Sequence, residues 1–182
     1  MIGWKVGFGS PEALARLGLE RPLVAPLPEE GLLADGATVD VSSWTSPVLE
    51  AEVAVYAGRG LGVAIELADI DVPPDDAERI LAGGIYHRHV LLGPPRAHGL
   101  DGVTARVLRD GRDVATTDDL TALTGSVEFV LETVRLHAGR ELDDGELVIA
   151  GSVVPPEPIA PGEHWRVELL PLGALELRVA RV

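Results

Sequence analysis

The chain has 182 residues, a length that suits one domain with its own hydrophobic core. Its 29 acidic residues exceed the 15 basic ones, and the formal net charge of −14 disfavours binding to nucleic acid or to an anionic membrane surface. The sequence has no cysteine and no apolar run of bilayer-spanning length, which excludes thiol chemistry and a transmembrane helix. We therefore expect a single cytoplasmic domain over residues 1–182, with no nucleic-acid or membrane partner.

The predicted elements are mainly short strands, because 21 glycines and 14 prolines divide the chain into short segments rich in valine and isoleucine. We predict strands, in chain order, over residues 1–8, 48–57, 61–68, 85–92, 103–108, 113–117, 147–150, 165–170 and 174–179. Residues 19–47 contain four prolines and are expected to be irregular chain with short strands.

Helices are predicted in three places. Ser10 is suited to cap a short helix over residues 11–17, and residues 75–81 form one or two helical turns. Apolar residues recur at helical spacing over residues 120–138, and Gly139 is suited to end that helix. The expected fold class is α+β, mostly β, with one substantial helix.

Three glutamates lie on the strands predicted over residues 48–57 and 61–68. With Arg59 at the centre of a three-residue loop, Glu52 pairs directly with Glu66, and Glu50 lies two residues along on the same face. Apolar residues of this hairpin then pair on the opposite face, where they can form core. The pattern therefore predicts three carboxylates on one face of a hairpin.

Three converging carboxylates need a counter-charge or raised pKa values, because like charges opposite each other destabilise a sheet. Their hard oxygens suit Mg²⁺ or Mn²⁺. A solvated hairpin face is the alternative interpretation, although Tyr56 and two alanines make this face unusually apolar for one.

Lys5 is the only lysine among the 15 basic residues. A lysine can lose its proton near neutral pH, whereas an arginine cannot. A single lysine in this arginine-rich chain therefore has two interpretations: it has a role in proton transfer, or it occurs there by chance.

Two further candidates are less specific. His87 and His89 are spaced like the two-histidine step of a cupin metal site, with His164 in a segment that could complete it, but Gly93 stands where a glutamate is expected. A surface or substrate-facing pair is the favoured interpretation. Ser152 lacks the flanking glycines of a nucleophile elbow and is interpreted as a hydrogen-bonding loop hydroxyl.

Several segments, in this order, resemble the fumarylacetoacetate hydrolase superfamily, and in particular its branch of 2-keto-4-pentenoate hydratases and oxalocrotonate decarboxylases. The Trp4-Lys5 motif and the strand that carries Glu50 and Glu52 are together the most specific part of the resemblance. The matching segments are residues 3–7, 47–53, 64–66, 90–93, 151–152 and 161–162, and the similarity extends over nearly the whole chain.

The resemblance implies a rolled, mixed β-sheet and a divalent metal, Mg²⁺ or Mn²⁺, held by three acidic side chains. These correspond to Glu50, Glu52 and Glu66, and the active-site lysine corresponds to Lys5. The resemblance also implies a homodimer or larger homo-oligomer and a place in aromatic catabolism.

The implied activity is a hydratase reaction on a small 2-oxo acid, in which the metal stabilises an enolate. Lys5 would transfer the proton or offset the charge, and its pKa is expected to fall near the cation. Ser152 would hydrogen-bond the distal end of the substrate, and His87 would replace polar groups that the family has nearby. Hydrolysis of an acylpyruvate C–C bond and decarboxylation are the enzymatic alternatives.

The sequence also departs from the family. Gly83 and Gly84 stand where an Asp-Asn pair is expected, Leu23 stands where the family has an acidic residue, and a helical region usually precedes the Trp4-Lys5 motif. A catalytically inactive, metal-binding partner subunit therefore stays open as an alternative.

Overall fold

The structure is a computed structural model that describes residues 1–181. The strands are β1 (Gly3–Gly7), β2 (Leu23–Leu27), β3 (Leu32–Leu33), β4 (Thr38–Val39), β5 (Pro47–Tyr56), β6 (Gly60–Asp69), β7 (His87–Leu92), β8 (Thr104–Arg109), β9 (Arg112–Thr117), β10 (Leu147–Ser152), β11 (Glu157–Pro158), β12 (His164–Leu170) and β13 (Gly173–Val179). The helices are α1 (Pro11–Leu17), α2 (Ala77–Ala82) and α3 (Val127–Ala138), with one turn of 3₁₀-helix at Glu29–Gly31.

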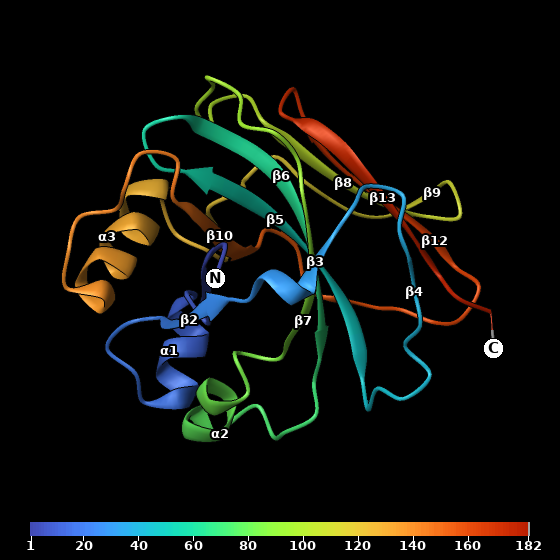
Figure 1. The fold of residues 1–182 in the computed structure, drawn as a ribbon, viewed down its shortest axis with the longest axis horizontal. Coiled ribbons are helices and arrows are strands. Elements are labelled where there is room, and N and C mark those ends of the chain that lie inside the picture. Colours follow the sequence, from blue (N-terminus) through green and yellow to red (C-terminus); the bar gives the residue numbers. More distant parts are fainter. Residues whose placement is uncertain (182) are drawn as a thin grey trace.

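The strands form two sheets (Figure 1). The larger one has eight strands in the order β2-β1-β10-β5-β6-β7-β3, with β11 beside β5. It is mixed, because β1 pairs with β10 and β3 with β7 in parallel, while the other pairs are antiparallel. The smaller sheet has the order β4-β13-β12-β8-β9, and its strands β12 and β13 pack against β6. This architecture confirms the expected rolled, mixed β-sheet with one substantial helix.

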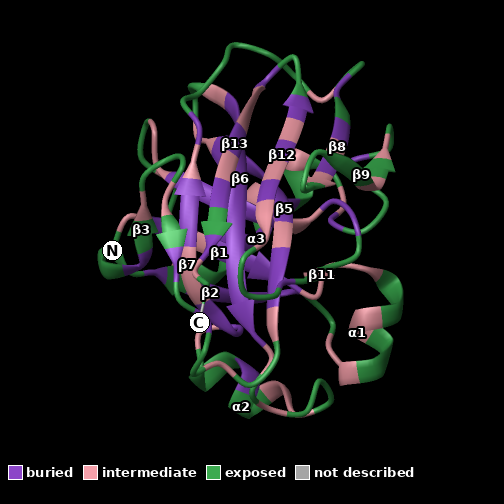
Figure 2. Ribbon diagram, turned by 90° about the vertical axis from the view of Figure 1, so that its right-hand side faces the viewer, coloured by how far each residue is buried: buried purple, intermediate pink, exposed green. Residues whose placement is uncertain are grey.

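The hydrophobic core lies between the two sheets. Figure 2 shows that β5 and β6 are buried over most of their length, whereas α1 and α2 lie at the edge of the molecule. Val53 and Val63 from the hairpin pack in one cluster with Trp165 and Leu177 from the smaller sheet. The apolar face expected for the hairpin is therefore the core face, and its burial is the main driving force for this arrangement.

The register of the hairpin differs from the expected one. Tyr56 pairs with Gly60, so the three-residue loop is centred on Gly58, which has a φ of 73°, and not on Arg59. Glu66 therefore lies opposite Glu50 and not opposite Glu52. The pairing differs by two residues, which keeps every side chain on its expected face.

The capping of α1 is confirmed, because Ser10 Oγ accepts a hydrogen bond from the backbone N–H of Ala13. The long helix begins at Val127, seven residues later than expected from the apolar spacing. Gly125 has a φ of 79° and interrupts the helical backbone, and Ser126 then caps the helix by accepting from the Phe129 N–H. No helix within residues 1–181 is long and apolar enough to cross a membrane.

Strand β7 begins at His87 and not at residue 85. Ile85 and Tyr86 have φ values of 57° and 64°, in the left-handed region that residues other than glycine rarely adopt. The Ile85 N–H donates to the carbonyl of Ile80 at the end of α2, which holds the chain in this turn. This turn contributes a backbone carbonyl to the candidate active site.

Candidate active site

Three glutamates converge at the centre of the larger sheet. Glu50 and Glu52 lie two residues apart on one face of β5, and Glu66 of β6 lies opposite Glu50. One carboxylate oxygen from each residue lies within 4.8 Å of the others. Glu52 and Glu66 are fully buried and Glu50 is half-buried, which rules out the solvated hairpin face.

Each of the two buried glutamates leaves one oxygen without a hydrogen-bond partner among the described residues. These atoms are Glu52 Oε1 and Glu66 Oε2. Buried polar atoms are nearly always satisfied, so two orphan oxygens in one cluster need an explanation. A divalent cation supplies one, because carboxylate oxygens are the ligands that Mg²⁺ and Mn²⁺ prefer. The residues present therefore fit such a cation.

Lys5 of β1 lies against this cluster. Its Nζ donates hydrogen bonds of 2.7 Å to Glu66 Oε1 and 2.7 Å to the carbonyl oxygen of Ile85. Burial lowers the pKa of Lys5, but the charges of Glu66, Glu50 and Glu52 raise it by more, so the pKa lies above its ordinary value. The side chain is therefore an ammonium ion when no cation is bound.

The carboxyl pKa values differ within the cluster. Burial raises the pKa of Glu52 well above its ordinary value, and the charges of Glu66 and Glu50 add to this. Burial likewise raises the pKa of Glu50. At Glu66 burial acts in the same direction, but Lys5 and His87 outweigh it and hold the pKa below its usual range. Without a cation, Glu66 carries the most stable negative charge of the three.

Two backbone groups that the sequence analysis missed also contact the cluster. The left-handed turn at Ile85 directs its carbonyl to Lys5, and the Gly151 N–H donates 2.8 Å to Glu52 Oε2. Gly151 has a φ of 95° and lies at a bulge in the pairing of β10 with β5. A glycine within a strand pattern indicates such a bulge, so Gly151 could have been singled out. Nothing in the sequence pattern marks Ile85.

Ser152 lies beside the cluster, opposite Glu52 in the pairing of β10 with β5. Its Oγ–H donates 2.6 Å to the carbonyl oxygen of Val154. The hydroxyl oxygen keeps lone pairs that can accept a hydrogen bond. Ser152 is thus near the glutamates and half-buried, and it lines the same cavity as Lys5 and Glu50.

His87 contacts Glu66 from another side, with Nδ1 2.8 Å from Glu66 Oε1. His87 does not line the cavity to which Lys5, Glu50 and Ser152 contribute. It lines a second cavity of about 470 Å³, together with Gly83 and Gly84.

The histidines do not form a metal site. His89 stacks on Trp44 with 5.8 Å between ring centroids, and His164 pairs with Glu176 in the smaller sheet. Among residues 1–181, no histidine joins a group with the spacing of metal ligands. The cupin-like alternative is therefore wrong.

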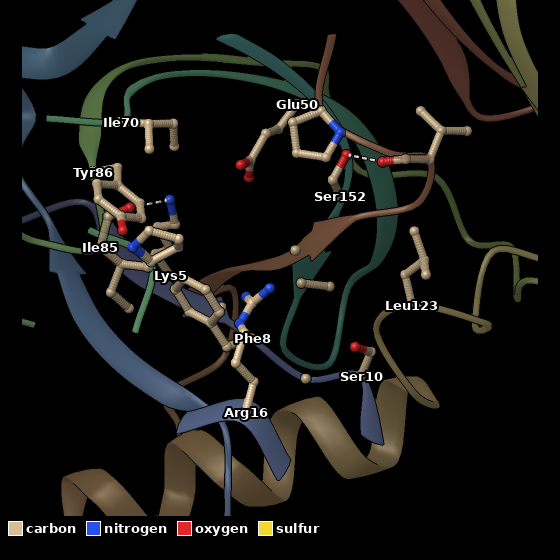
Figure 3. Close-up of a pocket in the computed structure, with 17 residues that line it drawn as sticks. Lys5, Phe8, Ser10, Arg16, Glu50, Ile70, Ile85, Tyr86, Leu123 and Ser152 are labelled. Atoms are coloured by element: carbon tan, nitrogen blue, oxygen red, sulfur yellow. Dashed lines mark hydrogen bonds between the residues drawn. The ribbon is translucent and has the colours of Figure 1, made fainter. Parts of the chain in front are cut away.

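A cavity of about 310 Å³ opens onto the cluster (Figure 3). Lys5, Glu50 and Ser152 contribute polar groups to its wall. Most of the remaining lining is apolar or glycine, with Phe8, Ile70, Ile85, Leu123, Ala150, Val154 and Pro156 among the residues. Its size and mixed lining are typical of a site for a small molecule.

No family model matches the sequence, but comparison with known proteins finds several similar enzymes. The chain is 26% identical to the TodF product hydratase of Pseudomonas putida, with 100% of this chain and 77% of that protein covered. It is 25% identical to 2-keto-4-pentenoate hydratase 1 of Dechloromonas aromatica, with 95% of this chain and 75% of that protein covered.

Two solved structures share the fold. One is 4-oxalocrotonate decarboxylase from Pseudomonas putida G7, complexed with magnesium and adipate, with a TM-score of 0.83 at 20% identity over 98% of this chain and 78% of that one. The other is fumarylpyruvate hydrolase from Pseudomonas aeruginosa, in complex with Mn²⁺ and pyruvate, with a TM-score of 0.74 at 20% identity over 98% of this chain and 89% of that one. The chain is thus similar in sequence to 2-keto-4-pentenoate hydratases and shares its fold with a 4-oxalocrotonate decarboxylase and a fumarylpyruvate hydrolase, which supports the resemblance to this branch of the fumarylacetoacetate hydrolase superfamily.

Proposed function

We propose that the protein is a divalent-metal-dependent enzyme acting on a small 2-oxo acid, with hydration of a 2-keto-4-pentenoate-type substrate as its reaction. One observation carries the proposal: Glu50, Glu52 and Glu66 converge, with two orphan oxygens, beside a buried ammonium ion at a small cavity. Relatives that are hydratases support the choice of reaction.

Glu50, Glu52 and Glu66 would hold Mg²⁺ or Mn²⁺. Solved relatives in the same fold contain magnesium with adipate and Mn²⁺ with pyruvate, which supports the choice of metal and of an acidic ligand. When bound, a divalent cation supplies Lewis acidity toward the oxygens of a 2-oxo acid.

The chain's own residues would position the substrate and supply a proton. Lys5 is held by Glu66 and the Ile85 carbonyl, which leaves its third N–H free for the substrate. Hydration adds one water molecule, with a proton at one carbon and a hydroxyl at another. Lys5 would give the proton from Nζ, water would give the hydroxyl, and the remaining proton of that water would return to Nζ. Ser152 can accept a hydrogen bond from the ligand through Oγ.

His87 is better placed to orient Glu66 than to bind substrate. Its hydrogen bond engages Oε1, the same oxygen that accepts from Lys5, and so leaves Oε2 for the cation. Hydrogen bonds of this kind to a ligand side chain fix its orientation and tune metal affinity.

The proposal is tested by the absorbance of a 2-hydroxydienoate substrate. Its depletion should require Mg²⁺ or Mn²⁺, stop with EDTA, and be lost in Glu52→Gln. An acylpyruvate and a 2-oxo acid prone to decarboxylation, assayed beside it, distinguish the alternative reactions. Metal binding without turnover of any of these substrates would refute the enzymatic proposal and indicate a non-catalytic partner subunit.

We also propose that the domain works in the cytoplasm as a homo-oligomer. Phe129 and Leu136 of α3 are 40% and 51% exposed, and exposed apolar side chains favour association. Light scattering coupled to size-exclusion chromatography tests this, and a monomer at working concentration would refute it.

A further inference from the structure

His87 contacts Glu66 and also lines the second cavity, of about 470 Å³. This cavity is formed where Pro26 of β2, the last residues of α2 and His87 at the start of β7 come together. Helix α2 contacts β2 directly and lies below it in Figure 1. No described residue lines both this cavity and the one that holds Lys5, so the two cavities are separate.

The imidazole of His87 leaves one nitrogen without a partner. Nδ1 lies 2.8 Å from Glu66 Oε1, whereas Nε2 is buried and has no hydrogen-bond partner among residues 1–181. The neighbouring Gly31 has no side chain to cover this nitrogen, and a Cβ atom there would lie only 2.8 Å from Nε2. Buried polar atoms are nearly always hydrogen-bonded, so an orphan nitrogen on a residue of a cavity wall indicates a ligand.

The rest of the wall restricts the chemistry of that ligand. Most of it is apolar or glycine: Pro26, Pro28, Leu81, Ala82, Gly83 and Gly84. Glu30 adds a carboxylate, and no lysine or arginine of the described chain lines the cavity. A carboxylate and a net charge of −14 disfavour an anion, and a water molecule alone needs about two to four polar partners. The wall therefore favours a small uncharged molecule with an apolar body.

A hydroxyl is the polar group that suits Nε2. Lys5 and His87 lower the pKa of Glu66 against the effect of burial, so Glu66 is a carboxylate and the proton of its bond with His87 is on Nδ1. Nε2 is then an acceptor in a neutral imidazole and a donor in an imidazolium. A hydroxyl can donate to the first and accept from the second, so the match does not depend on the charge of His87.

We propose that this cavity is a second binding site, for a small uncharged molecule that has a hydroxyl group on an apolar body, an alcohol or a phenol. The hydroxyl would hydrogen-bond to His87 Nε2, and the apolar body would lie against Pro26 and Leu81. The inference does not depend on the proposed function. An occupant would nevertheless lie one imidazole away from Glu66, and would so affect how His87 holds that carboxylate.

The test compares phenol with toluene, which has the same ring and a methyl group in place of the hydroxyl. Dissociation constants are measured by NMR titration in EDTA, and intermolecular NOEs to the Leu81 methyl groups locate the ligand. His87→Phe keeps a ring but removes Nε2. It should weaken phenol binding by about tenfold, the scale of one hydrogen bond to a buried group, and should leave toluene binding unchanged.

A second pair of variants tests the wall and does not depend on the folding of His87→Phe. Leu81→Ser removes apolar surface from the wall and should weaken both ligands by about threefold. The matched control is Leu170→Ser, because Leu170 is 46% exposed against 42% for Leu81 but lies in the smaller sheet, outside the cavity. This variant should leave both dissociation constants unchanged.

Any of four results would overturn the assignment. The first is that phenol fails to bind the wild-type protein at millimolar concentration, which would mean that the cavity holds water only. The second is NOEs from phenol to Leu123 of the first cavity and none to Leu81. The others are equal weakening of phenol and toluene by His87→Phe, and equal effects of Leu81→Ser and Leu170→Ser. Because no metal or 2-oxo acid takes part in the titration, none of these results would count against the proposed function.

Discussion

Lys5 Nζ donates a 2.7 Å hydrogen bond to Glu66 Oε1, although β10 and β5 lie between their strands in the sheet order. In a flat sheet, strands three places apart would be separated by about 14 Å, too far for a lysine side chain. The curl of the larger sheet brings the two side chains together. The buried ion pair therefore depends on the rolled architecture and not on local sequence.

Replacing Lys5 with methionine keeps much of the side-chain volume but removes the cation. Glu66 would then be buried without its main counter-charge, and we expect a loss of about 3 kcal/mol in the free energy of unfolding. Turnover should fall by about 100-fold or more, the scale of a lost general acid–base group. Urea unfolding in EDTA and the hydratase assay measure the two effects.

A double-mutant cycle distinguishes the ion pair from simple packing. The double variant combines Lys5→Met with Glu66→Gln and leaves neither charge of the pair unpaired. Its free energy of unfolding should therefore be higher than the sum of the two single-variant losses predicts. The expected coupling is about 1–3 kcal/mol. Additive effects would show that the pair does not contribute as proposed.

Glu52→Gln should stabilise the metal-free protein while removing its response to metal. The pKa of Glu52 is raised by burial and by its acidic neighbours, so loss of the carboxylate relieves an unfavourable arrangement. A glutamine can still accept from the Gly151 N–H and can donate to a neighbouring carboxylate. We expect a gain of about 1 kcal/mol, or roughly 2–4 °C in Tm for a chain of this size.

Thermal melts with EDTA and with Mn²⁺ test this expectation. The wild-type Tm should rise with Mn²⁺ concentration, because a ligand of the native state stabilises it by mass action, and the Glu52→Gln Tm should not. Glu20→Gln removes an exposed carboxylate elsewhere and is the matched control. A metal-dependent rise in Tm that persists in Glu52→Gln would contradict the assigned ligand set.

His87→Phe should weaken metal binding by about tenfold without removing it, because the ring is kept and the hydrogen bond to Glu66 is lost. His87→Asn offers an amide donor near the position of Nδ1 and should lose less affinity. Titration calorimetry with Mn²⁺ measures both dissociation constants. If the two variants lost the same affinity, the hydrogen bond would not be what orients Glu66.

The face pattern of the hairpin could be predicted from sequence, but its register could not be predicted correctly. Alternation of apolar and acidic residues fixes which side chains share a face, and it placed Glu50, Glu52 and Glu66 together. The register depends on the loop, where the backbone freedom of Gly58 allows the turn to centre one residue earlier. This shift of the loop changes each pairing by two residues, so Glu50, Glu52 and Glu66 still share one face, as predicted.

Contacts between distant segments explain what the sequence did not show. The left-handed turn at Ile85 depends on its hydrogen bond to the end of α2, and the position of His87 depends on a bulge between β6 and β7.

Glu146 anchors the strand that carries Lys5, and this contact predicts a pH dependence of stability. Its carboxylate accepts hydrogen bonds from the indole N–H of Trp4, from both terminal nitrogens of Arg140 and from the Asp143 N–H. The hydrogen bonds from Arg140, followed by those from Asp143 and Trp4, lower the pKa of Glu146 to about 2 against partial burial. The ordinary glutamate pKa applies in the unfolded chain.

A carboxyl whose pKa is lower in the folded state stabilises the protein above its unfolded pKa and loses that contribution as the pH falls toward the folded value. Glu146→Gln should therefore cost about 1–2 kcal/mol at pH 7, a figure reduced from the full shift because Arg140 is 45% exposed. The gap to the wild-type protein should narrow as the pH falls from about 5 toward 2. Urea unfolding over the pH range in which both proteins stay folded measures this gap.

The matched control is Glu141→Gln, which removes a carboxylate with a side chain that is 85% exposed. Exposed ion pairs contribute little, so this variant should differ from the wild-type protein by less than about 0.5 kcal/mol. A gap for Glu146→Gln that stayed constant with pH would mean that the carboxylate contributes through packing alone. The charge on Glu146 would then have no part in fixing Trp4, and with it β1, against the rest of the larger sheet.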